Sequence, residues 1–296
     1  MKRDFLKLSD LSLAEHRSLR DRAKALKALR RDRKVVETLK GRTLALVFEK
    51  PSTRTRASFE AAMVQLGGSV IVLGGADSQI SRGETIADTA RVVSRYVDGM
   101  MFRTFGDDRL VEFAQAASVP VINGLSEGAH PVQLLADLMT MEERLGEISG
   151  RKVAFVGDAA CNMALSWIEA GRLFGFEVVL AAPPLYRPKA ELLHGVKAYD
   201  RAADAVAGAD VIATDVWTSM GQEAEAKERV RNLEGFTVDE ALVKKAKAGA
   251  IVLHCLPAHR GEEISAGVID AANSAVWDEA ENRMHAQKAL LELLLA

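Results

Sequence analysis

The chain has only two cysteines, Cys161 and Cys255, among its 296 residues. Two distant cysteines make no disulfide framework, so the sequence favours a reducing compartment and predicts a cytoplasmic location. The chain has no large excess of charge of either sign, because its 39 Lys and Arg nearly balance its 41 Asp and Glu. No overall field therefore favours nucleic acid or an anionic membrane as a partner. Long apolar runs are also missing, which predicts a soluble, unsecreted protein.

Hydrophobic residues make up 48% of the chain, enough for a sizeable core, and the length fits two compact domains better than one. Short runs rich in Val, Ile and Leu alternate with stretches of helical period, as in a parallel sheet covered by helices. We predict an α/β fold with two domains, each a parallel β-sheet flanked by helices, and an active site in the cleft between them.

The apolar runs define the predicted strands. In the first half they are TLALVF (43–48), VIVL (70–73), GMMF (99–102) and PVIN (120–123). In the second half they are KVAFV (152–156), EVVLAA (177–182), DVIAT (210–214), AIVLHC (250–255) and AVW (275–277).

A long helix is predicted from Pro131 to Leu145, followed by a Ser149-Gly150 break that marks the domain junction. The first domain is expected to cover residues 1–148 and the second 149–278. The segment 279–296 has apolar residues at helical spacing and is expected to join the first domain, although spacing alone does not say where it packs.

Residues 17–34 hold many Lys and Arg among leucines and alanines. Such a stretch can form a nucleic-acid face or the solvated side of an amphipathic helix. We favour the helix, because no aromatic interleaving or binding motif accompanies the charges.

The segment FEKPSTRTRASFE (48–60) carries the strongest chemical signal. A strand ends, helix-start residues follow, and unpaired N–H groups at the new helix's N-terminus attract an anion. Four residues add donors around a phosphate: Ser52, Thr53, Arg54 and Thr55. The alternative is a capped helix whose arginines meet surface carboxylates. The length of the STRTR string favours the anion site.

Other polar segments also follow predicted strands, where open α/β sheets assemble ligand sites. They are FRTF (102–105), GLSEGAHPVQ (124–133), VGDAACNMA (156–164), DVWTSMGQE (215–223) and HCLPAHRG (254–261). Arg103, His130 and Gln133 can polarise a carbonyl and hold an amide-like group. Each alone is more often a structural residue, and their shared sheet edge favours the functional interpretation.

Cofactor motifs are weak or missing. The turn GDAACN lacks the three-glycine spacing of a dinucleotide site. The chain has no Walker A string, HExxH or paired CxxC. We therefore predict no organic cofactor and no metal.

Over nearly its whole length, the chain resembles the aspartate and ornithine carbamoyltransferase family in a series of motifs that occur in order: FEKPSTRTRASFE, FRTF, HPVQ, DVWTSMGQE, HCLPAHRGEE and DEAENRMHAQK (278–288). HCLP and DVWTSMGQE are similar to the ornithine enzymes, whereas aspartate enzymes usually carry HPLPR and putrescine enzymes usually lack the SMG segment. The resemblance implies transfer of a carbamoyl group from carbamoyl phosphate to ornithine, giving citrulline and phosphate for arginine biosynthesis. It also implies a homotrimer or a multiple of trimers, with carbamoyl phosphate bound by the first domain and ornithine by the second.

The resemblance assigns site residues position by position. Those implied to contact carbamoyl phosphate are Ser52, Thr53, Arg54, Thr55, Gln79, Arg103, His130, Gln133, Cys255, Leu256 and Arg283. Those implied to hold ornithine are Asn162, Asp215, Ser219 and Met220. Arg103, His130, Cys255 and Asp215 are the implied catalytic residues. Ala160-Cys161 before Asn162 and a shortened stretch at 184–203 depart from the family pattern.

The residues leave some roles open. Asp215 and Cys255 are candidates for orienting the neutral amine, but the sequence does not assign the base. Cys255 can equally be an inert buried thiol. A non-catalytic paralogue and a hydride-transferring enzyme are the alternative functions, and the complete STRTR, HPVQ and HCLP strings favour the transferase.

Overall fold

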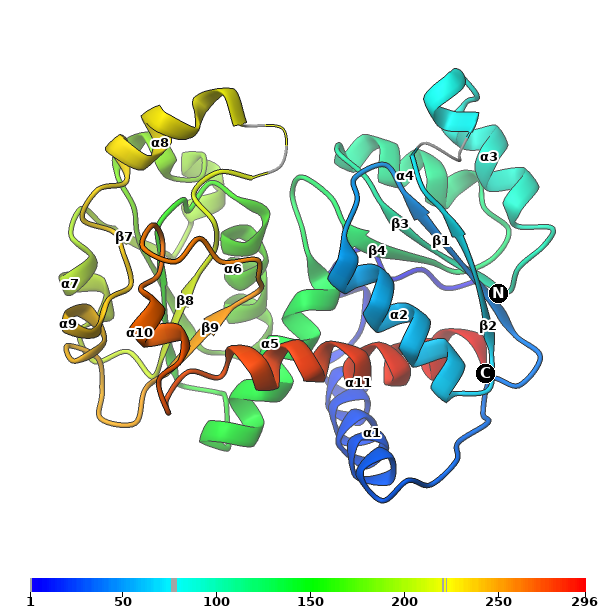
Figure 1. The fold of residues 1–296 in the computed structure, drawn as a ribbon, viewed down its shortest axis with the longest axis horizontal. Coiled ribbons are helices and arrows are strands. Elements are labelled where there is room, and N and C mark those ends of the chain that lie inside the picture. The colour runs from blue at the N-terminus through cyan, green and yellow to red at the C-terminus, as the bar shows by residue number, and fades with distance from the viewer. Residues whose placement is uncertain (1, 76–78, 220, 222) are drawn as a thin grey trace. The chain divides into compact units, whose positions relative to one another are not determined.

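The structure, a computed structural model, describes residues 2–75, 79–219, 221 and 223–296. Contacts between residues divide the chain into two compact units, shown in Figure 1. Unit 1 comprises Met1–Ala136 and Asn282–Ala296, and unit 2 comprises Asp137–Glu281. The divisions fall inside helices α5 (Pro131–Leu145) and α11 (Val276–Leu295). Each unit contains one parallel sheet flanked by helices, so the predicted α/β class is confirmed.

The sheet of unit 1 has the strand order β2-β1-β3-β4 with parallel pairing throughout. Its strands are β1 (Thr43–Phe48), β2 (Ser69–Leu73), β3 (Gly99–Arg103) and β4 (Val121–Leu125). The helices are α1 (Leu13–Arg31), α2 (Thr53–Gln65), α3 (Ile86–Val93) and α4 (Asp107–Ala116), with 3-10 turns η1 (Leu8–Asp10) and η2 (Gln79–Arg82). The four predicted strands of this half are confirmed, with small shifts at their ends.

Strands β1, β3 and β4 are buried on both faces, as is usual in a parallel sheet, whereas the edge strand β2 is partly exposed. Ala45 and Val47 alternate toward the layer of α3 and α4, where the rings of Phe102 and Phe113 stack with centroids 4.3 Å apart. The opposite face approaches α11 closely, because a Cβ on Gly99 would lie 2.6 Å from a Leu295 methyl carbon. Glycine at this position lets the last helix pack directly on the sheet.

The N-terminal segment protects the edge of this sheet. The Phe5 N–H donates to the Val121 carbonyl over 2.8 Å, and the Asn123 N–H donates to the Phe5 carbonyl over 2.8 Å. These bonds cover strand groups that could otherwise pair with another chain. Helix α1 then begins at a Ser12 capping box and buries Leu19 and Leu26 on one side, which confirms the amphipathic helix predicted in this region.

Unit 2 has a second parallel sheet with the order β7-β6-β5-β8-β9. Its strands are β5 (Lys152–Val156), β6 (Glu177–Ala181), β7 (Lys197–Tyr199), β8 (Val211–Thr214) and β9 (Ile251–His254). The helices are α6 (Asn162–Phe174), α7 (Ala202–Val206), α8 (Ala226–Asn232), α9 (Glu240–Val243) and α10 (Ala266–Ile269), and the 3-10 turns are η3 (Pro184–Tyr186), η4 (Ala190–Leu193) and η5 (Glu223–Glu225).

Two elements of unit 2 differ from the sequence predictions. The predicted strand AVW (275–277) is wrong, because Val276 begins α11 and only an isolated bridge joins Ser274 to Val252. Its apolar run is short, and Asp278 and Glu279 follow in the first helical turn, where carboxylates are favourable. The edge strand β7 was not predicted, since KAY has no apolar run to mark it.

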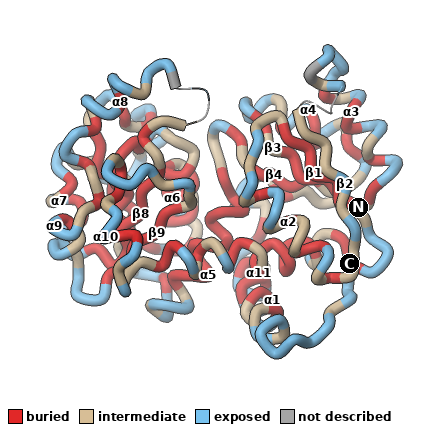
Figure 2. Tube along the Cα trace, viewed as in Figure 1, coloured by how far each residue is buried: buried red, intermediate tan, exposed pale blue. Residues whose placement is uncertain are grey.

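Figure 2 shows burial concentrated along the strands and the inward sides of the helices in each unit. The helices keep exposed outer sides, as amphipathic helices on a sheet do. Within the part of the chain that the structure describes, no helix is both long and apolar enough to cross a membrane.

Replacing Phe113 by Ala should lower the free energy of unfolding of unit 1 by about 3–5 kcal/mol, because it removes a fully buried ring and leaves a cavity against Phe102. Urea unfolding followed by circular dichroism measures the change. Val111→Ala on the same helix is the matched control, since Val111 is 43% exposed. Equal effects of the two substitutions would contradict this account of the core.

Candidate active site

Parallel pairing brings the carboxyl ends of the unit 1 strands to one edge of the sheet. Ser52 follows β1, Arg103 is the last residue of β3, and His130 lies between β4 and α5. These three of the residues predicted for carbamoyl phosphate therefore share this edge, as expected for ligand sites of open α/β sheets.

The N-terminus of α2 has the geometry of an anion site. Ser52 is its N-cap: the Ser52 hydroxyl accepts a hydrogen bond from the Thr55 N–H over 3.3 Å and donates to Thr55 Oγ1 over 3.1 Å. Thr53 is exposed in the first turn. Arg54 is half-buried, and its guanidinium makes no hydrogen bond or ion pair with another described residue. A helix dipole and an available cation thus coincide.

Arg283 connects three helices at this site. Its Nη2 donates to Thr55 Oγ1 on α2 over 2.9 Å, and its Nη1 donates to Gln133 Oε1 on α5. Only 4% of Arg283 is exposed, and Thr55 and Gln133 are fully buried. The guanidinium from α11 is therefore held rigidly beside the start of α2.

His130 is almost fully buried between positive charges. Burial lowers the pKa of His130 well below its ordinary value, and the Arg283 and Arg103 guanidiniums lower it further. The imidazole is therefore neutral at pH 7, where it can donate or accept a hydrogen bond. Its carbonyl accepts from the Gln133 N–H over 3.1 Å, which fixes it at the start of α5.

Lys50 is a further cation at this edge that the sequence analysis did not select. Burial lowers its pKa and the Arg103 charge adds to this effect, whereas Glu127 and Glu49 oppose it. Its Nζ lies 4.2 Å from the centroid of the Phe105 ring. Its position in the EKPSTRTR string was the available signal.

Gln79 is not joined to this group by any hydrogen bond among the described residues. It lies exposed at the start of η2. Cys255 and Leu256, which were also predicted to contact carbamoyl phosphate, belong to unit 2.

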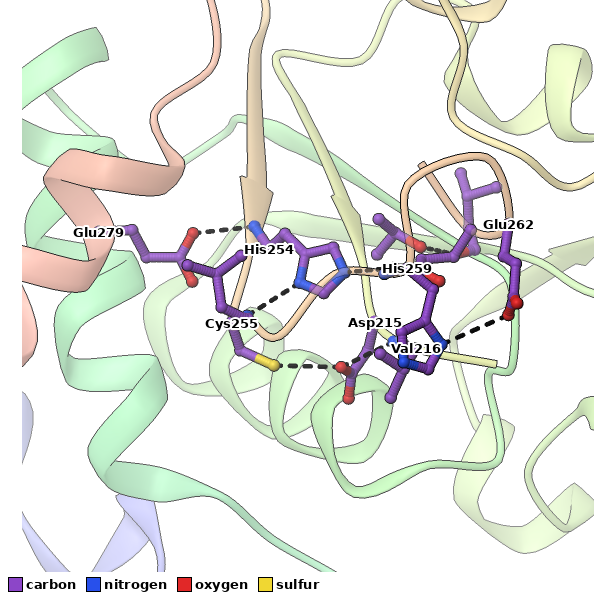
Figure 3. A network of polar contacts seen from close by, with 11 residues as sticks. Asp215, Val216, His254, Cys255, His259, Glu262 and Glu279 are labelled. Atoms are coloured by element: carbon purple, nitrogen blue, oxygen red, sulfur yellow. Dashed lines mark hydrogen bonds and ion pairs between the residues drawn. The ribbon is translucent and has the colours of Figure 1, made fainter. Parts of the chain in front are cut away.

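In unit 2, a thiol and a carboxylate face each other at the ends of β9 and β8 (Figure 3). Cys255 Sγ donates to Asp215 Oδ1 over 3.1 Å, and the same oxygen accepts the Val216 N–H over 2.8 Å. Burial raises the pKa of Asp215, and burial followed by the Asp215 charge raises the pKa of Cys255. The thiol is therefore protonated and acts here as a hydrogen-bond donor.

His254 fixes the backbone next to this thiol. Its Nδ1 accepts the Leu256 N–H over 2.9 Å, so the proton is on Nε2, which lies 3.0 Å from Glu263 Oε1. The His254 N–H donates to Glu279 Oε2 over 2.9 Å. These bonds hold Leu256 at a φ of 58°, a left-handed conformation that is uncommon for leucine.

The predicted ornithine residues lie on two neighbouring turns of unit 2. Asn162 begins α6, and Ser219 follows β8 in the same loop as Asp215. Met220 lies outside the described residues. The α6 N-cap, Cys161, has its pKa raised first by burial and then by Asp215 and Asp158, which places the start of α6 beside both carboxylates.

Arg229 contacts both turns, and no motif in the sequence pointed to it. It forms an ion pair with Asp158, its Nε donates to the Trp217 carbonyl over 2.5 Å, and it stacks 4.9 Å from the Tyr186 ring centroid. Burial raises the pKa of Asp158, and the Arg229 charge opposes this rise.

Asp215, His254 and Cys255 place potential metal-ligand atoms within 4.8 Å of one another. Both ring nitrogens of His254 are already used by Leu256 and Glu263, and the Cys255 thiol is used by Asp215. These contacts make a hydrogen-bonded network rather than a metal set, and the lack of a metal or organic cofactor stays a prediction.

Parallel sheets with polar residues at the strand ends are typical of α/β enzymes. The family model for the aspartate/ornithine carbamoyltransferase carbamoyl-P binding domain matches residues 3–143, and the model for the Asp/Orn binding domain matches 149–294. The ornithine carbamoyltransferase of Halorhodospira halophila is 53% identical, over 99% of this chain and 99% of the relative.

Solved structures agree with these matches. The ornithine carbamoyltransferase from Pyrococcus furiosus is 49% identical with a TM-score of 0.94, over 99% of this chain and 97% of that chain. The enzyme from Thermus thermophilus is 39% identical with a TM-score of 0.91, over 100% of both chains. The chain belongs to the aspartate/ornithine carbamoyltransferase family, which confirms the resemblance seen in its motifs.

Arg229→Met should destabilise unit 2 by about 3–5 kcal/mol, because it leaves the Asp158 carboxylate buried without its counter-charge. All three tryptophans lie in this unit, so urea unfolding followed by tryptophan fluorescence reports on it. A second change, Asp158→Asn, should recover part of the loss. Exposed Arg231 on the same helix provides the control Arg231→Met. No difference between the two methionine variants would refute the assigned role of this ion pair.

Proposed function

We propose that this chain transfers the carbamoyl group of carbamoyl phosphate to the side-chain amine of L-ornithine, giving L-citrulline and phosphate. The supporting observation is the polar edge of unit 1, where the α2 N-terminus, Arg54, Arg103, neutral His130 and Arg283 come together. The name shared by relatives that match the full chain supports ornithine as the acceptor.

The donor phosphate is assigned to the start of α2. Ser52, Thr53 and Thr55 offer hydroxyl and backbone donors there, and the helix dipole favours a dianion. Arg54 supplies a positive charge that forms no ion pair with a described carboxylate. Arg283 is held against Thr55 and therefore adds a fixed positive charge.

The carbonyl of the donor is assigned to Thr55, Arg103 and His130. A neutral imidazole can donate one hydrogen bond to the carbonyl oxygen without competing for the phosphate. Negative charge develops on that oxygen when the amine attacks, and preorganised donors stabilise it. Gln133 is assigned to the carbamoyl amide, and Gln79, Cys255 and Leu256 complete the proposed donor contacts.

The acceptor is assigned to unit 2. Asp215 pairs with the α-ammonium of ornithine, while Asn162, Ser219 and Met220 hold the amino-acid end. The protonated Cys255 thiol, fixed by its hydrogen bond to Asp215, is proposed to orient the attacking amine. Its raised pKa argues against a thiolate nucleophile.

The reaction then needs no covalent enzyme intermediate. The neutral side-chain amine of ornithine forms a new bond to the carbonyl carbon, giving a tetrahedral intermediate. The bond from that carbon to the phosphate oxygen breaks, and Arg54 and Arg103 offset the charge of the leaving phosphate. The attacking nitrogen loses one proton, which ends on the departing phosphate, as the ureido group of citrulline forms, and catalysis rests on positioning and electrostatics.

The finer assignments extend this proposal. We propose a homotrimer and a role in arginine biosynthesis, which the family resemblance supports, and a cytoplasmic location, which the scarcity of cysteine supports. A carbamoyl phosphate domain at 1–148, joined by 279–296, and an ornithine domain at 149–278 are proposed as the functional division.

The direct test incubates the purified protein with carbamoyl phosphate and, separately, ornithine, putrescine, aspartate, lysine or N-acetylornithine. Carbamoylated product and phosphate are measured above the uncatalysed background. Citrulline from ornithine alone is the expected result. Preference for another amine would overturn the acceptor assignment, and no product with any amine would indicate a non-catalytic paralogue.

Arg103→Ala should slow turnover by roughly a hundredfold or more, the scale for loss of an oxyanion donor. Steady-state kinetics with ornithine and carbamoyl phosphate measure it. Arg91→Ala removes an exposed arginine whose ion-pair partner among the described residues is Asp88, and it should leave turnover unchanged. Near-normal turnover of the Arg103 variant would exclude its role at the carbonyl.

A further inference from the structure

A second concentration of positive charge lies in unit 1, in an open pocket of about 590 Å³. The pocket is formed by the end of α1, the segment at 30–37, the end of α2 and α11. Five cations line it, against the single carboxylate of Glu37: Arg30, Arg31, Arg33, Lys34 and Lys288. The chain as a whole has a formal net charge of -2, so this accumulation is local.

Few of these charges are compensated. The side chains of Arg30, Arg33 and Lys34 make no hydrogen bond or ion pair with another described residue. Glu37 pairs with Lys40 over 3.2 Å. Cations in the last turn of α1 favour its dipole, which accounts for Arg30 and Arg31. That effect does not account for Arg33, Lys34 and Lys288, which lie outside α1.

Lys288 is the least expected of the five cations, because its side chain is buried. Only 2% of it is exposed, and its Nζ donates to Gln65 Oε1 over 2.8 Å. Burial lowers its pKa to about 8, the Arg30 and Arg22 charges act in the same direction, and Glu292 opposes them. The Glu292 carboxylate is already held by Arg22 over 2.6 and 2.8 Å. A buried ammonium thus lies among like charges, which an anion in the pocket would relieve.

The same pocket also has an apolar wall. Val35 is 84% exposed and Val64 is 66% exposed, and both line the pocket beside buried Leu26. Aliphatic side chains next to cations offer contacts to the organic part of an anionic ligand. Small-molecule sites typically measure about 300–1,000 Å³, a range that includes this pocket.

We propose that this pocket binds a small molecule carrying two adjacent phosphate groups, either inorganic or attached to an organic body. The phosphates are contacted from the open side by Arg30, Arg33 and Lys34. Lys288 supplies positive charge from the buried side of the pocket. The pocket shares no residue with the proposed donor site. The two lie toward opposite ends of α2, a 13-residue helix that is about 20 Å long.

The test titrates inorganic pyrophosphate and ADP into full-length protein by calorimetry at low ionic strength, where charge-based binding is least screened. Arg54→Ala is the background, because the proposed donor site can also take phosphate. The pocket variant adds Arg30→Glu and Lys34→Glu, two exposed positions. The control variant adds Arg17→Glu and Lys244→Glu, which are exposed, lie outside the pocket and change the net charge equally.

We expect one pyrophosphate per chain in the background protein, at least about tenfold weaker binding in the pocket variant, and no change in the control. Tighter binding of ADP than of pyrophosphate would assign the apolar wall to an organic body, and equal affinity would assign the site to the phosphates alone. Absence of binding in the background protein, unchanged binding in the pocket variant, or equal losses in both variants would overturn the proposal. Displacement of pyrophosphate by a more tightly bound single-stranded RNA would also overturn it, in favour of a nucleic-acid face.

Discussion

Parallel strand pairing is the constraint on which the arrangement of this protein depends. Every strand of a parallel sheet ends at the same edge, and each chain segment that leaves the edge must return over a helix. The loops after β1, β3 and β4 therefore meet in unit 1, and those after β5, β8 and β9 meet in unit 2. Residues far apart in the sequence become neighbours without any need for long insertions.

Each unit keeps one ionisable side chain uncharged, next to positive charges in unit 1 and next to a negative charge in unit 2. In unit 1, burial and the neighbouring Arg283 and Arg103 charges keep His130 neutral. In unit 2, burial and the Asp215 carboxylate keep the Cys255 thiol protonated. The proposed chemistry needs both conditions, because an anionic donor must be bound while the acceptor amine must remain uncharged when it attacks.

Periodicity was sufficient to predict most of the fold, since buried parallel strands leave continuous apolar runs such as TLALVF and KVAFV. It was insufficient for two short segments: β7, with the sequence KAY, has no apolar run, and AVW is apolar but its Val276 begins a helix. Motif position also located the edge residues Ser52, Arg103, His130 and Asp215. Contacts such as Arg283 with Thr55 and Arg229 with Asp158 could not be predicted from spacing, because they join residues 228 and 71 positions apart.

Arg283 has a consequence for how the polypeptide is made. Unit 1 is discontinuous: its sheet and the start of α2 precede unit 2 in the sequence, whereas Arg283 and Leu295 follow it. During synthesis from the N-terminus, α11 cannot pack on the first sheet until the whole second unit has been translated. A nascent chain interrupted within unit 2 would carry residues 52–55 without the buried Arg283 guanidinium, so translation of α11 is the step that completes the proposed phosphate site.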